Sequence, residues 1–126
     1  MPTPTPSPVS YPNVAGSYSG TIDDTTANIT SSMALSIHQK KKTISGEFTV
    51  GAPLQGNGPF SGYVGTDPYI QFTVVPQDNN LAPLFFYGWV QTDESIKGSY
   101  CSLNRQAQCD PAAGASGTWY VVKSSS

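Results

Sequence analysis

The chain has 126 residues, which is enough for one domain with a real hydrophobic core. Only 11% of them are charged, against about 25% in typical globular chains, so hydroxyls, amides and glycine supply most of the polarity. The net charge of −2 argues against nucleic acid as a partner, because phosphate binding needs a concentrated basic face. No apolar run reaches the ~18 residues of a membrane helix. We therefore expect contact with a membrane only through a parent chain.

The first segment, 1–13, reads MPTPTPSPVSYPN and carries a proline at almost every second position. Such a segment cannot pair in a sheet and favours an extended polyproline II strut. We expect it to be a stalk or linker in front of a domain at 14–123, with a short tail at 124–126. The start is typical of a piece taken from a longer protein, and its Pro/Thr alternation resembles the stalks that tether domains on bacterial cell surfaces.

Eight strand patterns follow, separated by segments rich in turn-forming residues. They cover 16–22, 30–38, 43–50, 59–65, 69–75, 84–91, 95–101 and 117–123. Helical periodicity is absent at useful length. Because the connections are short, neighbouring strands should pair as antiparallel hairpins.

A five-residue pattern recurs in five of the strands: a large apolar residue, any residue, glycine, any residue and a second large apolar residue. The copies are YSGTI at 18–22, ISGEF at 44–48, FSGYV at 60–64, FYGWV at 86–90 and IKGSY at 96–100. Because alternate residues of a strand share a face, each glycine lies on the same face as its two apolar neighbours. We expect that face to be the interior.

Inward glycines favour a small closed sheet, because they let strands bend sharply and leave room for large side chains on facing strands. The sequence therefore predicts an all-β fold, an eight-stranded antiparallel up-and-down β-barrel. A β-sandwich is the alternative, and the long loops at 51–58 and 102–116 leave it open. The large side chains expected inside include Tyr18, Met33, Leu35, Ile44, Phe48, Phe60, Phe72, Phe86, Tyr100 and Trp119. We expect them to form a packed core with at most a small pocket at one mouth.

The two cysteines, Cys101 and Cys109, bound the loop-like segment CSLNRQAQC. An even count in such a segment predicts one disulfide, and the spacing does not fit a Cys-x-x-Cys redox or zinc motif. On the loop-entropy relation, this short ring would stabilise the fold by about 2.6 kcal/mol. A disulfide in turn indicates an oxidising, extracytoplasmic compartment.

The sequence offers little for catalysis or metal binding. His38 is the only histidine and lies at a strand end, where we expect a surface residue. There is no Gly-x-Ser-x-Gly nucleophile motif, and the acidic pair Asp23-Asp24 falls in a predicted turn, where carboxylates are common. A calcium site built from this pair and Asn28 is a minor alternative. We therefore expect no enzyme activity, no cofactor and no resident metal.

One feature stands out on the face assigned to solvent. Phe85, Tyr87 and Trp89 line one strand, Tyr69 lies on the strand before it, and Tyr63 lies one strand further back. If these strands pair in chain order, the five side chains form one aromatic band. Soluble monomers seldom leave such a patch uncovered, and its rings suit stacking on sugars or anchoring a protein partner. The alternatives are that the cysteine loop or the stalk covers the band, or that a homodimer buries it.

The opening GSYSGTI, the closing GTWYVV and the hairpins between them resemble the calycin-like barrels, especially the avidin-type pattern near the first strand. The resemblance covers the layout of the strands. No tryptophan falls where an avidin-type ligand box would need one, so no binding residue is carried over. The stalk, glycine-rich barrel and cysteine loop together also resemble domains appended to bacterial membrane-anchored proteins, including receptor-type serine/threonine kinases, although nothing kinase-like is present in these residues.

These features together predict a non-catalytic, extracytoplasmic binding or sensory module, secreted or displayed on a bacterial cell surface. The predicted contact surface is the aromatic band, and the predicted ligand is a glycan or a protein partner. The alternatives are a lipocalin-like carrier of a small hydrophobic ligand and a purely structural surface domain.

Overall fold

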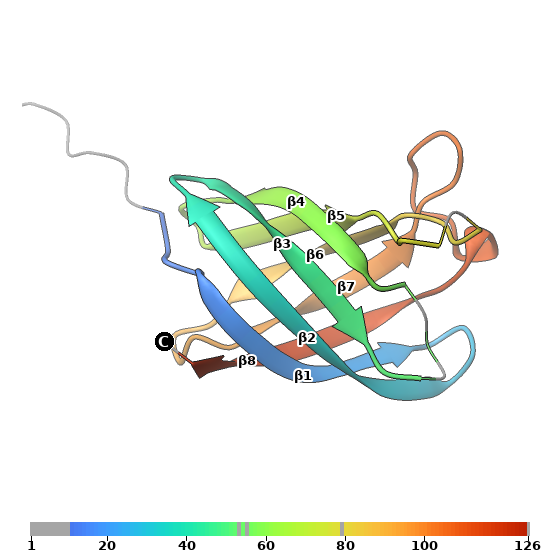
Figure 1. The fold of residues 1–126 in the computed structure, drawn as a ribbon, viewed down its shortest axis with the longest axis horizontal. Helices are drawn as coiled ribbons and strands as arrows, with labels where there is room; N and C mark the ends of the chain where they lie inside the picture. The colour runs from blue at the N-terminus through green and yellow to red at the C-terminus, as the bar shows by residue number, and fades with distance from the viewer. Residues whose placement is uncertain (1–10, 53, 55, 79, 126) are drawn as a thin grey trace, which may run out of the picture.

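The computed structural model describes residues 11–125 except 53, 55 and 79. Within this range eight strands close into a barrel in chain order, each antiparallel to its neighbours, with β8 returning to β1 (Figure 1). The strands are β1 (Gly16–Asp24), β2 (Ile29–Lys40), β3 (Thr43–Val50), β4 (Gly58–Val64), β5 (Tyr69–Val74), β6 (Leu84–Val90), β7 (Ile96–Ser102) and β8 (Ser116–Ser125). A short 3₁₀-helix, η1 (Pro111–Ala113), precedes β8. The predicted up-and-down barrel is confirmed, and the closed strand order excludes the sandwich.

Every strand begins and ends within two residues of its predicted range. Barrel closure explains the extension at the end of the chain, because Ser125 of β8 pairs with Ser17 of β1. The register shifts between Ser17 and Tyr18, so an irregularity of the bulge type lies where the barrel closes. β1 also runs on through Asp23 and Asp24. These two residues therefore lie in a strand and not in the turn that the sequence predicted.

The five patterned glycines face the interior, as predicted, because each pairs with inward residues of the neighbouring strands. The physical reason is only partly the predicted one. At Gly20 an added Cβ would overlap the carbonyl oxygen of Tyr120, and at Gly46 it would overlap that of Ser36. The other three copies meet a neighbouring carbonyl in the same way. These glycines therefore allow the close approach of adjacent backbones that strongly coiled strands require.

Two of the glycines also provide the room that the sequence predicted. Gly88 and Gly98 pair directly across β6 and β7, and Gly98 also pairs with Trp119 on β8. The indole N–H of Trp119 donates to the carbonyl oxygens of Tyr87 and Ser99, at 3.3 and 3.0 Å. The buried indole thus reaches across the pair of glycines, and the two strands that carry them satisfy its polar atom.

Aromatic rings fill the middle of the barrel. Phe72, Phe86 and Tyr100 stack across β5, β6 and β7 with ring centroids 5.0 and 5.3 Å apart. Trp119 meets the two phenylalanines edge-on. All ten large side chains named from the sequence as interior are buried. The predicted packed core is confirmed, and a cavity of about 40 Å³ lies beside Tyr100 near one mouth of the described barrel.

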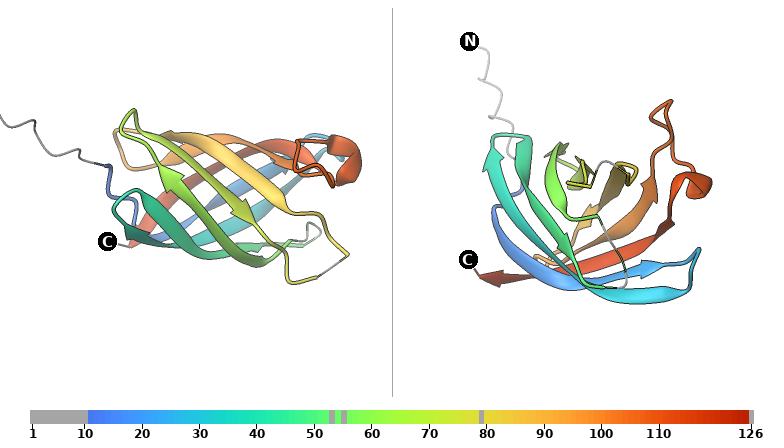
Figure 2. Two further views of the ribbon diagram at one scale, coloured as in Figure 1. Left: turned by 90° about the horizontal axis from the view of Figure 1, so that it is seen from above. Right: turned by 45° about the vertical axis from the view of Figure 1, so that its right-hand side comes forward.

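The barrel has two unlike ends (Figures 1 and 2). One, the hairpin end, carries the short connections 41–42, 65–68 and 91–95, the described start of the chain and the end of β8. The other, the loop end, carries the connections 25–28, 51–57, 75–83 and 103–115. Among the described residues, no helix is long and apolar enough to span a membrane.

The described start of the chain packs against the hairpin end. Val14 is fully buried, and Tyr11 packs against the same core. Gln39 Nε2 donates to the Pro12 carbonyl, while Gln39 Oε1 accepts the Val14 N–H, at 2.9 and 2.8 Å. The last part of the predicted stalk is therefore held against the barrel, whereas residues 1–10 lie outside the described residues.

The predicted disulfide joins Cys101, near the end of β7, to Cys109 in the connection 103–115, with their Cα atoms 5.4 Å apart. Within the loop, the Asn104 side chain accepts two backbone N–H groups. The connection is therefore a braced hairpin, and it projects from the barrel at the loop end (Figure 2). The disulfide is consistent with an extracytoplasmic location.

We predict that Gly20→Ala destabilises the barrel, because its Cβ would overlap backbone atoms of Tyr120 and Val121 that cannot rotate away. Overpacking of this kind costs about 1–3 kcal/mol. Gly51→Ala is the matched control, since its Cβ would crowd only the hydroxyl of Ser32, which can rotate. Urea unfolding of both variants measures the difference, and equal stabilities would contradict the close approach of the strands.

Because of two interior tyrosines, we predict that the free energy of unfolding falls at alkaline pH. Burial, followed by the charge of Glu94, raises the pKa of Tyr18 from 10.0 to about 12. Burial, followed by the charges of Asp24 and Asp23, also raises the pKa of Tyr100. Because the pKa is raised in the folded state, the contribution of each phenol to the free energy of unfolding is complete below pH 10, where the unfolded chain also keeps its tyrosines protonated. This contribution is lost as the pH rises towards 12.

The free energy of unfolding of the wild type should therefore fall steeply above pH ~10. The double variant Tyr18→Phe/Tyr100→Phe should show a shallower fall, because neither position can then release a proton in the unfolded state. Circular dichroism at neutral pH controls for an intact fold. Identical slopes for both proteins in alkali would show that these two phenols do not carry the effect.

Opening the ring at Cys101 and Cys109 should lower the free energy of unfolding by about 2.6 kcal/mol, because the unfolded chain regains loop entropy. Denaturant unfolding of Cys101→Ala/Cys109→Ala, compared with the oxidised wild type, measures this loss. Wild type unfolded in the presence of a reductant is the control and should match the variant. A reduced protein as stable as the oxidised one would refute the prediction.

Candidate binding surface

The predicted aromatic band lies on the outer wall of β4, β5 and β6. Tyr63, Tyr87 and Trp89 expose 45%, 36% and 49% of their surface, while Tyr69 and Phe85 are half-buried. All five alternate along their strands with buried residues, which is why they point outward. Their outward orientation is confirmed, and their role in binding stays a prediction.

The five rings form one connected surface. Trp89 meets Tyr69 edge-on across β5 and β6, with ring centroids 5.1 Å apart. Phe85 and Tyr87 lie 5.6 Å apart along β6. Across the three strands, Gln71 of β5 pairs with both Tyr63 of β4 and Tyr87 of β6, and burial, followed by the charges of Tyr63 and Tyr87, raises the pKa of Tyr69. The strand pairing assumed from the sequence is therefore the one present.

The cysteine loop does not cover the exposed members of the band in the described part of the chain. The loop projects at the loop end (Figure 2), whereas Trp89 lies one residue before β6 ends at the hairpin end. Tyr69 and Phe85 owe part of their lower exposure to packing against Trp89 and Tyr87. The band is therefore available to a ligand or partner along most of its length.

A shallow groove of about 480 Å³ continues the band across β6, β7, β8 and β1. The outward side chains that line it form two rows, with one residue from each strand. The strand register places Tyr87, Ser99, Thr118 and Asp23 in the first row, and Trp89, Lys97, Tyr120 and Thr21 in the second. The groove thus joins two members of the band to a third exposed ring, Tyr120, which is 43% exposed.

The floor of this groove includes main chain. Gly88 and Gly98 lie between the two rows and line the groove with backbone alone. Because residues 88 and 98 face the interior, the outer side of the floor at these two positions is main chain. Trp119 supports the same wall from inside through its hydrogen bonds to the carbonyls of Tyr87 and Ser99. The floor is therefore held by the core and not by mobile side chains.

The groove presents both donors and acceptors of hydrogen bonds between its aromatic rings. Lys97 supplies an ammonium group, and hydroxyls come from Thr21, Ser99 and Thr118. Asp23 supplies a carboxylate, one oxygen of which accepts the hydroxyl of Thr30. With one cation and one anion, the lining has no net charge, so it suits a ligand that is polar but uncharged.

Sequence analysis did not identify Tyr120, Lys97 or Asp23 as part of a binding surface. Strict alternation in the last strand already placed Tyr120 on the outer side, opposite the buried Trp119. In the predicted up-and-down order β8 already pairs with β7, which places Tyr120 two strands from Trp89. Closure of the barrel adds Thr21 and Asp23 of β1 beside β8. Asp23 was missed because β1 extends further than predicted.

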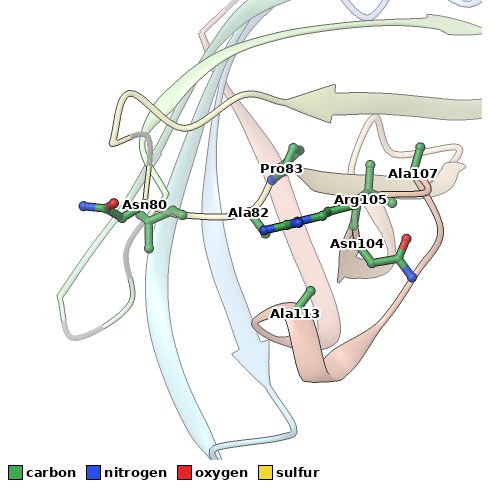
Figure 3. Close-up of a pocket in the computed structure, with 9 residues that line it drawn as sticks. Asn80, Ala82, Pro83, Asn104, Arg105, Ala107 and Ala113 are labelled. Carbon is green, nitrogen blue, oxygen red and sulfur yellow. The ribbon is translucent and has the colours of Figure 1, made fainter.

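A second concavity, of about 800 Å³, lies at the loop end between the connection 75–83 and the braced hairpin. The Arg105 side chain extends across it towards Ala82 (Figure 3). The rest of its lining is apolar or amide, including Leu81 and Asn104. This cleft could not be predicted from the sequence, because its two walls come from connections that meet only in the folded barrel.

The other residues considered for chemistry do not assemble into a site. His38 is exposed on β2. Asp23 and Asp24 are adjacent in a strand and face opposite ways, and Asp24 is buried where its carboxylate accepts the backbone N–H groups of Thr26 and Ala27. The acidic pair therefore does not converge on a calcium ion. Across the described residues, no group of three or more His, Cys, Asp or Glu side chains could hold a metal ion.

Comparison with known proteins gives no match: no family model matches the chain, and no curated protein or solved structure is similar to it. The closed eight-stranded antiparallel barrel is compatible with a calycin-like fold. The fold thus defines a small antiparallel β-barrel with a disulfide-braced hairpin and an exposed aromatic surface.

Proposed function

We propose that this barrel is a non-catalytic, extracytoplasmic binding or sensory module whose ligand, a glycan or a protein partner, is held by the outer wall. The observation that carries the proposal is the continuous surface formed by the aromatic band and the adjoining groove. Tyr87 and Trp89 belong to both, and each exposes more than a third of its surface. Large exposed aromatic patches mark interaction sites on soluble proteins.

The arrangement of the barrel supports display of this surface on a longer chain. The described start of the chain and the end of β8 lie together at the hairpin end, so a tether attached at either would leave the outer wall free (Figure 1). The disulfide and the low content of charged residues, 11%, suit a protein exposed outside the cytoplasm. A bacterial cell surface, with the proline-rich segment as a stalk, fits these features.

The interior supports a carrier function less well. The cavity beside Tyr100 measures about 40 Å³, whereas pockets for small-molecule ligands span about 300–1,000 Å³. Stacked rings of Phe72 and Phe86 occupy the space that a lipocalin-like ligand would need. The outer wall is therefore the better candidate for the site.

We predict that Tyr87→Ser/Trp89→Ser abolishes ligand retention and leaves the fold intact, because both side chains are exposed and surface substitutions change stability by about 0.5 kcal/mol or less. The measurement is binding to arrays that carry glycans, cell-wall fragments and purified cell-surface proteins. Val75→Ser is the matched control, since Val75 is an outward apolar residue, 58% exposed, outside the groove.

Two results would refute this proposal. If the double variant binds every array feature as the wild type does, the outer wall is not the site. If the double variant unfolds cooperatively at a much lower denaturant concentration, Tyr87 and Trp89 belong to the structural framework instead.

A further inference from the structure

We propose that the groove between Trp89 and Tyr120 binds an uncharged saccharide chain, an inference that rests on the proposed binding function of the outer wall and names its ligand class. The site comprises the two rows of side chains on β6, β7, β8 and β1 and the backbone of Gly88 and Gly98 between them.

The rings of the groove are placed to pack against sugar rings. Trp89 and Tyr120 lie in the same row with one strand, β7, between them. Because neighbouring strands are about 4.8 Å apart, the two residues are separated by about 10 Å along the row, a span that a disaccharide covers. Tyr87 adds a third ring on the Trp89 side of the groove. The flat apolar faces of pyranose rings pack on aromatic rings of this kind.

The polar groups between the rings match the hydroxyls of a sugar, which both donate and accept hydrogen bonds. Lys97 lies between Trp89 and Tyr120 in the second row, and Ser99 and Thr118 occupy the equivalent positions of the first row. Asp23 ends the first row with an acceptor. A strongly acidic chain would meet the carboxylate of Asp23, and a strongly basic chain would meet the ammonium of Lys97, so the pair favours a neutral ligand.

The alternation of aromatic and polar side chains along the rows of the groove disfavours a protein or a second copy of the chain as the occupant. Stable protein interfaces bury about 800 Å² on each partner and exclude charged residues from their centre. Here Lys97, an exposed cation, stands between the two rings, and every aromatic residue of the groove has a polar neighbour in its row. A chain of sugars needs no apolar centre, because its hydroxyls can bond to the polar side chains while the faces of its rings pack on the aromatic side chains.

The floor of the groove is already organised for a ligand. The main chain at Gly88 and Gly98 forms part of the floor, and the indole N–H of Trp119 donates to the carbonyls of Tyr87 and Ser99 from the interior. A site whose floor is fixed before binding loses less conformational entropy when the ligand arrives. This matters for saccharides, which present few apolar atoms for binding.

The chain offers an internal reporter for the test, because it contains two tryptophans of opposite exposure. Trp89 is 49% exposed in the groove, and Trp119 is 2% exposed in the core. Titration with soluble neutral polysaccharides, namely laminarin, mannan, dextran and hydroxyethylcellulose, should shift the emission of Trp89 to shorter wavelengths and protect it from acrylamide. Trp89→Phe retains only the buried reporter, so its emission should not change on titration.

Affinity electrophoresis in gels containing the same four polysaccharides measures retention. At least one of them should retard the wild type, and Tyr120→Ser should weaken that binding by about tenfold or more. Val122→Ser is the matched control, because Val122 lies on the same face of β8 and is 42% exposed, yet does not line the groove. It should bind as the wild type does.

The outcomes separate this inference from the proposal on which it rests. Retention by none of the four polysaccharides overturns the saccharide inference, as does retention only by anionic polygalacturonate or cationic chitosan. Array binding confined to proteins, and lost in Tyr87→Ser/Trp89→Ser, would overturn the inference while the binding function of the outer wall stands. A dimer in light scattering that Tyr120→Ser dissociates would identify a second copy as the occupant and likewise overturn it.

Discussion

The close approach of neighbouring strand backbones at the inward glycines is the constraint on which this barrel depends. Each of the five positions brings the glycine Cα so near a carbonyl of the adjacent strand that a Cβ has no space. The strands can therefore coil tightly enough for β8 to pair with β1, and closure leaves no exposed sheet edge among the described strands. The core follows from closure: the large residues on either side of each glycine converge on one axis, where Phe72, Phe86 and Tyr100 stack.

The same constraint shapes the outer surface. Where Gly88 and Gly98 pair across β6 and β7, the missing inward side chains leave room for Trp119, and the outer side of the same backbone forms part of the floor of the groove. The indole nitrogen bonds to backbone carbonyls of both strands, so the core and the groove share one set of main-chain atoms. A ligand that contacts the floor therefore contacts backbone that the buried Trp119 supports, and not a loop.

Much of the fold could be predicted from the sequence because its signals are local. Alternation along each strand assigns the faces, and the glycine pattern identifies the interior, so the sequence alone predicts that Tyr87 and Trp89 face outward. The groove could not be predicted in the same way. Thr21 and Asp23 belong to it only because closure sets β1 beside β8, and such lateral order is a property of the whole sheet. The cleft at Arg105 could not be predicted for a similar reason, because the connections 75–83 and 103–115, which form its walls, are distant in sequence and meet only at the loop end of the barrel.

The position of the two chain ends has a mechanical consequence. Gly16 begins β1 and Ser125 ends β8 at the same end of the barrel, on strands that pair directly. A pulling force applied between the two ends of the described chain would first break the contacts of Pro12 and Val14 with Gln39, and would then break the hydrogen bonds of the β1–β8 ladder one after another, starting at Ser17 and Ser125. Unzipping of this kind resists far less force than shearing two strands past each other. As part of a tethered chain under tension from both sides, the barrel would open at its seam and lose the β1 wall of the groove first.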